Sequence, residues 1–320
     1  MKRQKNKIKI IFFGSDSFSV PILESFRSNF EVVLVVTKDD REAGRGKKLK
    51  ANPLKQFAEK LKLKLLIIEK LDGENIEKIK NIKADIYLVA AFGLMMPKTL
   101  LKSPIGVKTI NVHPSLLPLY RGPSPIESAI LAGDKKTGVS IMVLDEKMDH
   151  GPIIAQEEEI IDDEYDDFIT LSERLEKRVA NLLIKIIPDF VAGKIKPKLQ
   201  DENKAAYCKL VKKEDGKIDF KKDASDVLRH IRAFIHWPGS FASWKEKGKI
   251  IKIIEARLQN ALPELPYSAG MVFKTSNGKP AVVCGREAIV IETIQIEGKK
   301  PTDSISFLNG YHDFIGSNLG

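Results

Sequence analysis

The sequence predicts an α/β fold in two domains: a Rossmann-like domain with a doubly wound, mostly parallel sheet, and a C-terminal OB-like β-barrel. Three observations predict it. The chain has 320 residues, more than one hydrophobic core usually fills. In the first 190 residues, short apolar runs alternate with amphipathic stretches, which is the pattern of right-handed βαβ units. After residue 206, short strand-like runs follow one another, separated by Gly, Asn and Pro.

The first domain, residues 1–190, has the stronger pattern. Runs of apolar and β-branched residues predict strands over 7–13, 31–37, 63–68, 85–91, 107–112, 139–144 and 153–160. Apolar residues at helical spacing predict helices over 17–29, 53–61, 74–82, 124–132 and 164–190. Pro21 falls in the first turn of the first helix, where proline is tolerated. In such a sheet, ligands bind at the carboxyl ends of the strands.

The second domain, residues 207–320, follows a polar segment, 191–206, that contains Gly193 and Pro197 and is predicted to be a linker. One helix is expected over 226–234. Short strands are expected over 239–244, 249–258, 270–275, 281–284 and 288–295. Five short strands and a helix are typical of the OB fold, a common nucleic-acid-binding scaffold.

The composition indicates a soluble, cytoplasmic protein. Hydrophobic residues make up 43% and charged residues 30% of the chain, and no run approaches the ~18 apolar residues of a membrane span. The basic N-terminus resembles a signal peptide, but its apolar run is short and Gly-Ser-Asp follows it, so we interpret it as a first strand. Cys208 and Cys284 are too few for a disulfide framework, which fits a reducing compartment.

The net charge of +10 is distributed unevenly. Residues 1–190 hold 31 Lys/Arg and 28 Asp/Glu, a net charge of +3, and residues 191–320 hold 22 and 15, a net charge of +7. A basic surface attracts phosphates by releasing counterions, so the second domain is a candidate for binding nucleic acid. A lysine-rich solvated surface explains the same excess, and charge alone leaves both interpretations open.

Two common kinds of site are not expected. The turn after the first strand, from Gly14 to Phe18, has no G-x-G-x-x-G and no P-loop lysine, which argues against a dinucleotide fingerprint. The five histidines are neither paired at helical spacing nor flanked by cysteines. We therefore expect no metal site.

A histidine stands where a strand ends and prolines begin. Asn111 lies two residues before His113, so the two side chains point to the same side of the strand. Asp149 follows the strand predicted over 139–144 and approaches His113 if the two strand ends are neighbours. A carboxylate orients an imidazole and an amide donor helps to stabilise an oxyanion, so the three residues suit acyl transfer without a metal. A satisfied polar histidine is the alternative.

A basic insert lies inside the first domain. Residues 38–50 carry six basic and three acidic side chains, and Gly44 and Gly46 loosen the segment. It is either a solvated insert or an arm that touches a polyanion. We favour the arm, because long loops in compact α/β units are often functional.

At this point the motifs match a known family. The chain resembles the methionyl-tRNA formyltransferases, and its first domain resembles the wider folate-dependent formyltransferase superfamily. The resemblance runs from Ile8 to about Gly310. The matching sequence motifs are FFGSDSFSVPIL, AAFGLMMP, NVHPSLLP, YRGPSPI and the stretch that ends LDEKMDHGP. The insert REAGRGKKL and the C-terminal words KIDF and IRAFIHWPGSF resemble the parts that this family uses against tRNA.

The resemblance implies roles for individual residues. Asn111, His113 and Asp149 would form the catalytic trio. The formyl donor, 10-formyltetrahydrofolate, would lie along Ser115, Leu116, Leu117 and Pro118, with Phe92, Gly93 and Leu94 beside its pterin. The basic insert would bind tRNA through Arg41, Arg45, Lys47 and Lys48. In two places the chain departs from the family: Glu146-Lys147 replaces a stretch that usually holds a glycine, and Pro114 stands where several members have a small residue.

The resemblance also implies an activity. The enzyme would formylate the α-amino group of methionyl initiator tRNA for translation initiation, as a monomer and without a metal or a membrane. One alternative is a formyltransferase that acts on a sugar nucleotide or on a purine-precursor amine, since these share the first domain. Another is a non-catalytic RNA-binding protein, against which the intact trio argues.

Overall fold

The structure is a computed structural model of the chain, and it describes residues 7–43, 48–101, 107–259 and 268–320. The chain forms two compact units. The first contains residues 1–125, 137–160 and 172–208, and the second contains residues 126–136, 161–171 and 209–320. Among the described residues, no helix combines the length and the apolar character needed to cross a bilayer.

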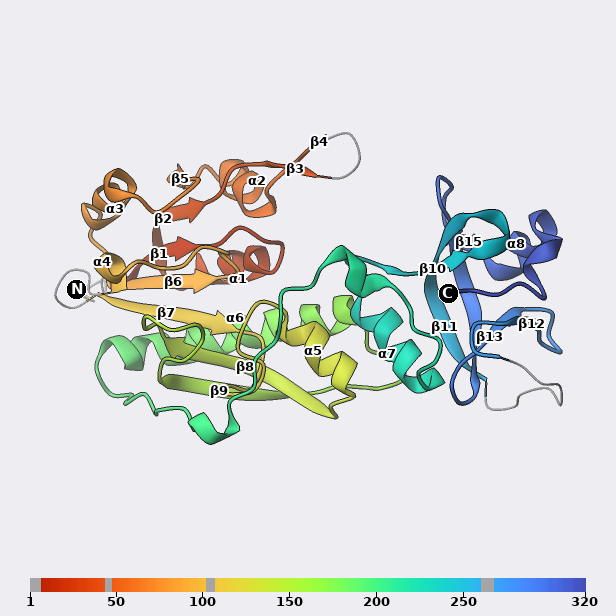
Figure 1. Ribbon diagram of the computed structural model, residues 1–320. Helices are drawn as coiled ribbons and strands as arrows, with labels where there is room; N and C mark the ends of the chain where they lie inside the picture. Colours follow the sequence, from red (N-terminus) through yellow and green to blue (C-terminus); the bar gives the residue numbers. More distant parts are fainter. Residues whose placement is uncertain (1–6, 44–47, 102–106, 260–267) are drawn as a thin grey trace. The chain divides into compact units, whose positions relative to one another are not determined.

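A seven-stranded sheet forms the centre of the first unit (Figure 1). Its strands, in the order β5-β2-β1-β6-β7-β8-β9, are β5 (Leu65–Ile67), β2 (Glu31–Thr37), β1 (Lys9–Phe13), β6 (Ile86–Ala90), β7 (Lys108–His113), β8 (Lys136–Val143) and β9 (Ile153–Ile160). The first five strands pair in parallel, and β8 pairs antiparallel with β7. The predicted doubly wound, mostly parallel sheet is confirmed.

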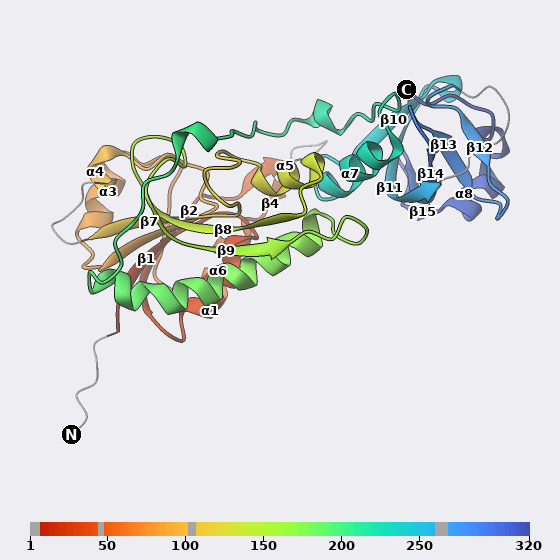
Figure 2. The same ribbon diagram turned by 90° about the horizontal axis from the view of Figure 1, so that it is seen from below.

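Helices cover the two faces of this sheet. Helices α1 (Ser19–Phe26) and α6 (Phe168–Val191) lie along one face, and α3 (Gly73–Lys80) and α4 (Lys98–Leu101) along the other (Figure 2). The chain also forms α2 (Pro53–Lys60) and, in the second unit, α5 (Pro125–Ala132). One core cluster joins alternate residues of β1, such as Ile11 and Phe13, to Ile76 and Ile79 of α3. The alternate buried residues of the strand and the helically spaced apolar residues of α3 thus pack together in one core.

Helix α6 begins at Phe168 and not at Glu164, where we expected it. The Oδ1 atom of Asp167 accepts hydrogen bonds from the amides of Ile169 and Thr170, at 2.8 and 2.9 Å. Asp167 therefore caps the helix, because a side-chain oxygen satisfies amide groups that have no partner inside the first turn.

The basic insert contains a short hairpin, β3 (Arg41–Ala43) paired with β4 (Lys48–Lys50). Its base is fixed to the sheet end. The amide group of Asn52 donates to the Thr37 hydroxyl and to the Lys38 carbonyl, and Lys55 forms an ion pair with Asp39 at 2.8 Å. The hairpin therefore projects from an anchored base.

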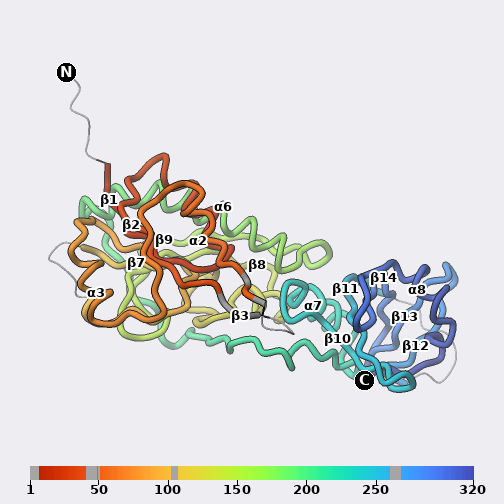
Figure 3. The backbone as a smooth tube through the Cα atoms, turned by 90° about the horizontal axis from the view of Figure 1, so that it is seen from above, coloured from red at the N-terminus to blue at the C-terminus, as the bar shows by residue number. Residues whose placement is uncertain are grey.

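The second unit is built on an antiparallel sheet (Figure 3). Its strands are β10 (Ser240–Trp244), β11 (Lys249–Gln259), β14 (Ala288–Ile296), β13 (Pro280–Val283) and β12 (Val272–Lys274) in that order, with β15 (Thr302–Asp303) on β14. The α-helices of its described C-terminal part are α7 (Ala224–Ala233) and α8 (Ser304–Gly310). Short 3-10 turns of this unit lie at Lys213–Gly216, Lys245–Lys247 and His312–Phe314, and a further one, Glu202–Lys204, lies in the first unit.

This sheet curls, and the end of the chain lies between its two edges. The amide of Leu319 donates to the Gly270 carbonyl at 2.8 Å, and that of Gly320 donates to the Ser243 carbonyl at 3.0 Å. Trp244, on the edge strand β10, is fully buried and packs edge-on against Phe314. The curled half-barrel agrees with the predicted OB-like second domain.

The polar segment after α6 does not leave the first unit directly. Lys198 exchanges two backbone hydrogen bonds with Ile153, at 2.7 and 2.8 Å. Further along, the carbonyl of Ala206 accepts from the amide of Arg121, and the amide of Cys208 donates to the carbonyl of Arg121, both at 2.8 Å. Residues 198–208 therefore pack on the first unit, a contact that their polar composition does not predict.

Candidate active site

The carboxyl end of β7 presents two polar side chains. Asn111 lies in register with Val89 of β6 and Met142 of β8, and His113 lies in register with Ser140 of β8. His113 is only 4% exposed. Central strands of the sheet therefore hold both side chains at the edge where ligands of such sheets bind.

Asp149 reaches both of them. Its Oδ2 atom lies 3.6 Å from Nδ1 of His113, and its Oδ1 atom lies 3.4 Å from Nδ2 of Asn111. The amide of Gly122 donates to Oδ2 at 2.9 Å. The structure thus brings together the three residues that the sequence predicted as a trio. Asn111, His113 and Gly122 thus surround the Asp149 carboxylate.

The loop that carries Asp149 has lysine, and not glycine, at position 147. Its positive φ falls on Asp149 itself, at +46°. Lys147 donates its amide to Oδ1 of Asp145 at 2.9 Å, and Nδ1 of His150 lies 2.6 Å from Oδ2 of Asp145. A side chain at Gly151 would meet the Val143 carbonyl at 1.8 Å, so glycine is required there. The substitution at position 147 therefore leaves Asp149 beside its partners.

A backbone carbonyl holds the other side of the histidine ring. Nε2 of His113 lies 2.8 Å from the carbonyl oxygen of Tyr120, whose own φ is +56°. A carbonyl only accepts, so Nε2 carries a proton in this arrangement. Both ring nitrogens of His113 therefore face oxygen acceptors. Nothing in the sequence points to Tyr120, because its contribution is a backbone atom and leaves no signal in residue type.

A buried arginine follows Tyr120. Arg121 is fully buried, and its guanidinium pairs with both carboxylate oxygens of Glu202, at 2.6 and 3.1 Å. It also donates twice to Oε1 of Gln200, at 2.8 and 3.0 Å, and once to the Tyr207 hydroxyl at 3.0 Å. The hydrogen bonds to Glu202 raise the pKa of Arg121, and Arg121 in turn lowers the pKa of the Glu202 carboxyl. Residue type does not reveal this group, since Gln200 and Glu202 lie in the predicted linker.

Three of the predicted folate residues have buried side chains. Phe92 packs edge-on against Phe13 in the core, with the ring centroids 5.5 Å apart. Ser115 is fully buried, and its hydroxyl donates to the Leu119 carbonyl at 2.6 Å. Leu117 is 4% exposed and is followed by a cis peptide bond to Pro118. In this arrangement a ligand would not contact these three side chains directly.

The other four predicted folate residues are accessible. Gly93 is exposed, and Leu94, Leu116 and Pro118 are partly exposed. Gly93 has a φ of +68°, a conformation that glycine adopts without strain. Its position is crowded as well, because an added Cβ would lie 2.7 Å from Nζ of Lys38. These four residues are the part of the predicted folate surface that can touch a ligand directly.

The four predicted tRNA contacts fall in or beside the hairpin. Arg41 is the first residue of β3, and Lys48 is the first residue of β4. Arg45 and Lys47 lie outside the described residues. Within the described ranges, no three His, Cys, Asp or Glu side chains gather as a metal site would require.

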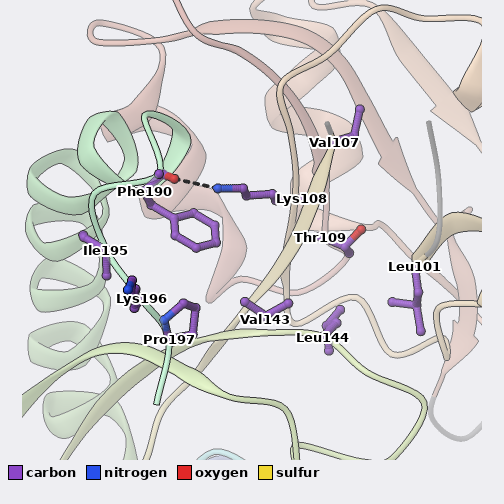
Figure 4. A pocket seen from close by; sticks show the side chains of 11 residues that line it. Leu101, Val107, Lys108, Thr109, Val143, Leu144, Phe190, Ile195, Lys196 and Pro197 are labelled. Carbon is purple, nitrogen blue, oxygen red and sulfur yellow. Dashed lines mark hydrogen bonds between the residues drawn. The ribbon is translucent and has the colours of Figure 1, made fainter. Parts of the chain in front are cut away.

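A separate hollow lies at the opposite end of β7 (Figure 4). It has a volume of about 430 Å³ and is lined by Leu101, Val107, Lys108, Thr109, Val143, Leu144, Phe190, Gly193, Ile195, Lys196 and Pro197. The ammonium of Lys108 donates to the Phe190 carbonyl at 2.8 Å and lies 4.3 Å from the centre of the Phe190 ring. Five residues of extended strand, about 17 Å, separate Lys108 from His113. The hollow is therefore not part of the trio's site.

Comparison with known proteins covers almost the whole chain. The Formyl transferase family model matches residues 6–191, and the model of the Formyl transferase C-terminal domain matches residues 210–312. A curated methionyl-tRNA formyltransferase of Fusobacterium nucleatum subsp. nucleatum is 37% identical over 323 residues, which cover 98% of this chain and 100% of that protein. One of Sulfurihydrogenibium sp. is 38% identical and covers 95% of this chain and 97% of its own.

Solved structures share the fold. The N-formyltransferase from Helicobacter canadensis, in complex with folinic acid and dTDP-3-aminofucose, superimposes with a TM-score of 0.63 at 22% sequence identity. The match covers 89% of this chain and 98% of that one.

Proposed function

The chain belongs to the methionyl-tRNA formyltransferase family, and we propose that it transfers the formyl group of 10-formyltetrahydrofolate to the α-amino group of methionyl initiator tRNA. The observation that carries this proposal is the full-length similarity to methionyl-tRNA formyltransferases, which includes the second domain and the basic insert. The product is N-formylmethionyl-tRNA, the substrate of translation initiation in organisms that use it.

The proposed chemistry follows from the trio. The amine attacks the formyl carbon and a C–N bond forms, while the carbonyl becomes an oxyanion. When this intermediate collapses, the bond to the folate nitrogen breaks, and the proton that leaves the amine ends on that nitrogen. Asn111 has two amide hydrogens and directs one toward Asp149, so the second is free to serve the oxyanion. Asp149 orients His113 and takes part in the proton movement.

His113 would change partners during this reaction. Its Nε2 atom donates to the Tyr120 carbonyl in the structure. We propose that the oxyanion replaces this carbonyl as the acceptor, while Nδ1 keeps facing Asp149 at 3.6 Å. The ring would then stabilise negative charge without leaving its buried site, so little reorganisation is needed as the charge develops.

The formyl donor would lie against the surface formed by Gly93, Leu94, Leu116 and Pro118. Gly93 and Leu94 follow β6, Leu116 and Pro118 follow β7, and all four are accessible, whereas Phe92, Ser115 and Leu117 support the wall from behind. The formyl carbon would then sit near Asn111 and His113. Backbone groups and apolar side chains hold a pterin without the phosphate cradle that the first turn lacks.

The tRNA would be held by charge. The hairpin insert would contact phosphates through Arg41, Arg45, Lys47 and Lys48, and residues 191–320, the linker and the second domain together, add a net charge of +7. Binding through phosphates releases counterions, so the affinity for tRNA should fall steeply as salt rises. We also propose the division of labour that the sequence suggests: 1–190 catalytic, 191–206 connecting and 207–320 tRNA-binding, in a cytoplasmic monomer.

The decisive experiment mixes the protein with methionyl initiator tRNA and 10-formyltetrahydrofolate and measures formyl-methionine after deacylation. A parallel reaction offers an amino-sugar nucleotide as the acceptor. Formyl-methionine in the first reaction alone supports the proposal. Transfer only to the sugar nucleotide would replace it with the alternative acceptor class, and tRNA binding without any transfer would indicate a non-catalytic RNA-binding protein.

A further inference from the structure

We propose that Gln200, in the segment after α6, is a positioning residue that holds the Asp149 loop against His113 and Asn111. This inference rests on the proposed function, because it assigns Asp149 a part in formyl transfer. Sequence alone places Gln200 in a linker, outside the catalytic domain. The structure places its side chain between the loop that carries Asp149 and the guanidinium of Arg121.

All the hydrogen-bonding capacity of the Gln200 amide is used. Its Nε2 atom donates to the carbonyl of Asp149 at 2.9 Å and to the carbonyl of Gly151 at 2.8 Å. Its Oε1 atom accepts from Nε and Nη2 of Arg121, at 3.0 and 2.8 Å. A guanidinium only donates and a carbonyl only accepts, so the amide fits in one orientation.

Arg121 fixes that orientation. The guanidinium is fully buried, and the paired bonds to Glu202 hold it from the other side. Arg121 also precedes Gly122, whose amide donates to the Asp149 carboxylate. The loop before α5 therefore contacts Asp149 twice, once through Gly122 and once through Arg121 and Gln200.

Asp149 needs this support. Its φ of +46° lies in the left-handed region, which a non-glycine residue keeps only when its surroundings hold it there. Gln200 bonds the carbonyl of this strained residue and the carbonyl two residues later. Without these bonds, the loop can relax and the carboxylate loses its approach to His113.

The test uses Gln200→Glu in the full-length protein. The glutamate keeps an oxygen for Arg121, so the buried guanidinium stays paired, but its second oxygen faces two carbonyl oxygens and cannot donate. The matched control is Asn203→Ala, an exposed amide in the same segment. We expect Gln200→Glu to lower kcat about 10- to 100-fold, since small displacements of a reacting group cost that much. KM for methionyl-tRNA should stay within about threefold, and the control should behave as wild type.

A double-mutant cycle separates positioning from general damage. If Gln200 acts through Asp149, Gln200→Glu should cost little more than about threefold in single-turnover rate when Asp149 is already alanine. The same fold loss in both backgrounds, or an unchanged kcat in Gln200→Glu alone, would overturn the proposal.

A second measurement does not depend on activity. Hydrogen exchange in the peptide that spans residues 145–152 should be faster in Gln200→Glu than in wild type and unchanged in Asn203→Ala. Equal protection in the two variants would also overturn the proposal. A wild-type protein that forms no formyl-methionine refutes the proposed function instead, and the exchange result still decides whether Gln200 holds the loop.

Discussion

The carboxylate of Asp149 lies 3.6 Å from Nδ1 of His113, although His113 ends strand β7 and Asp149 lies in a loop after β8. A second contact, from the amide of Gly122, fixes the same carboxylate oxygen. The histidine ring is thus held between this oxygen and the Tyr120 carbonyl. A group held on two sides needs little rearrangement to meet a developing charge, which is how electrostatic catalysis gains most of its effect.

Loss of the imidazole should affect turnover more than binding. We expect His113→Ala to lower kcat about 10²- to 10³-fold and to leave the Kd for tRNA almost unchanged, because His113 is buried and is not one of the proposed phosphate contacts. Steady-state kinetics and filter binding measure the two quantities. The exposed His312, replaced by alanine, is the control. Parallel losses of turnover and of tRNA binding would contradict the role.

The charge of Asp149 should matter apart from its shape. Asparagine tolerates a positive φ and can still accept from Gly122, so Asp149→Asn should fold normally. It should nevertheless lose about 10²-fold or more in kcat, since the carboxylate that orients His113 is gone. Thermal unfolding checks the fold and the formylation assay checks the rate. A variant that melts normally and retains full activity would remove Asp149 from the mechanism.

The hairpin arm should act on tRNA alone. Replacing Arg45 by alanine should raise KM for tRNA roughly tenfold, the usual cost of one charge-assisted hydrogen bond, and leave the KM for the formyl donor unchanged. Lys60→Ala, at an exposed position at the end of α2, controls for the loss of one positive charge. If KM for tRNA does not change, the insert is only a solvated loop.

Gly151 should resist substitution. An added Cβ would lie 1.8 Å from the Val143 carbonyl, so Gly151→Ala has to displace the loop that carries Asp149. We expect a loss of about 1–3 kcal/mol in stability from the overpacking, with a fall in kcat. Gly73→Ala, where a Cβ meets no atom within 4 Å, should change neither. Chemical denaturation and kinetics measure both effects. Wild-type values for Gly151→Ala would refute the crowding argument.

One carboxylate should make stability depend on pH near neutrality. Burial raises the pKa of Glu176, on α6, from 4.5 to about 7. Because the pKa is higher in the folded state, the Glu176 carboxyl group costs no stability below pH 4.5, where it is protonated in both states. As the pH rises through 7, the group ionises in the folded state and the protein loses that part of its stability. Glu176→Gln should therefore be more stable than wild type at pH 8, by about 1 kcal/mol after allowing for the half-exposed position.

Thermal unfolding at pH 5 and at pH 8 tests this. The difference between wild type and Glu176→Gln should grow as the pH rises, while the exposed Glu31→Gln should show no such trend. An advantage of the glutamine variant that is larger at pH 5 than at pH 8 would reverse the sign and refute the assignment.

Much of the first domain could be predicted from sequence, because buried strands are continuous apolar runs. β2 and β9 have the predicted ends, and other strands differ from the prediction by a few residues. Asn111 and His113 could be placed together by strand alternation. The sequence alone could not decide whether Asp149 approaches His113. That approach depends on which strand ends are neighbours, which is a property of the assembled sheet.

Other features left no local signal. Helix α8 is a single short stretch, Ser304–Gly310, whose two buried apolar side chains do not make a helical stripe. Gln200 and Glu202 look like solvated linker residues, yet they contact Arg121, which is 79 and 81 positions away in the sequence. The contacts of a polar segment can be predicted as well as those of an apolar one only when the distant residues that it touches are known.

The hydrogen bonds of residues 198–208 to Ile153 and Arg121 decide where this protein could be divided by engineering. A chimera joined near residue 190 would take Gln200 and Glu202 from one parent and Arg121 from the other. The hydrogen bonds that support Asp149 would then have to form between residues of two different parents. A junction placed after Cys208 keeps both sides in one parent. Exchange of the C-terminal part between relatives should therefore begin at Lys209, well downstream of the end of α6.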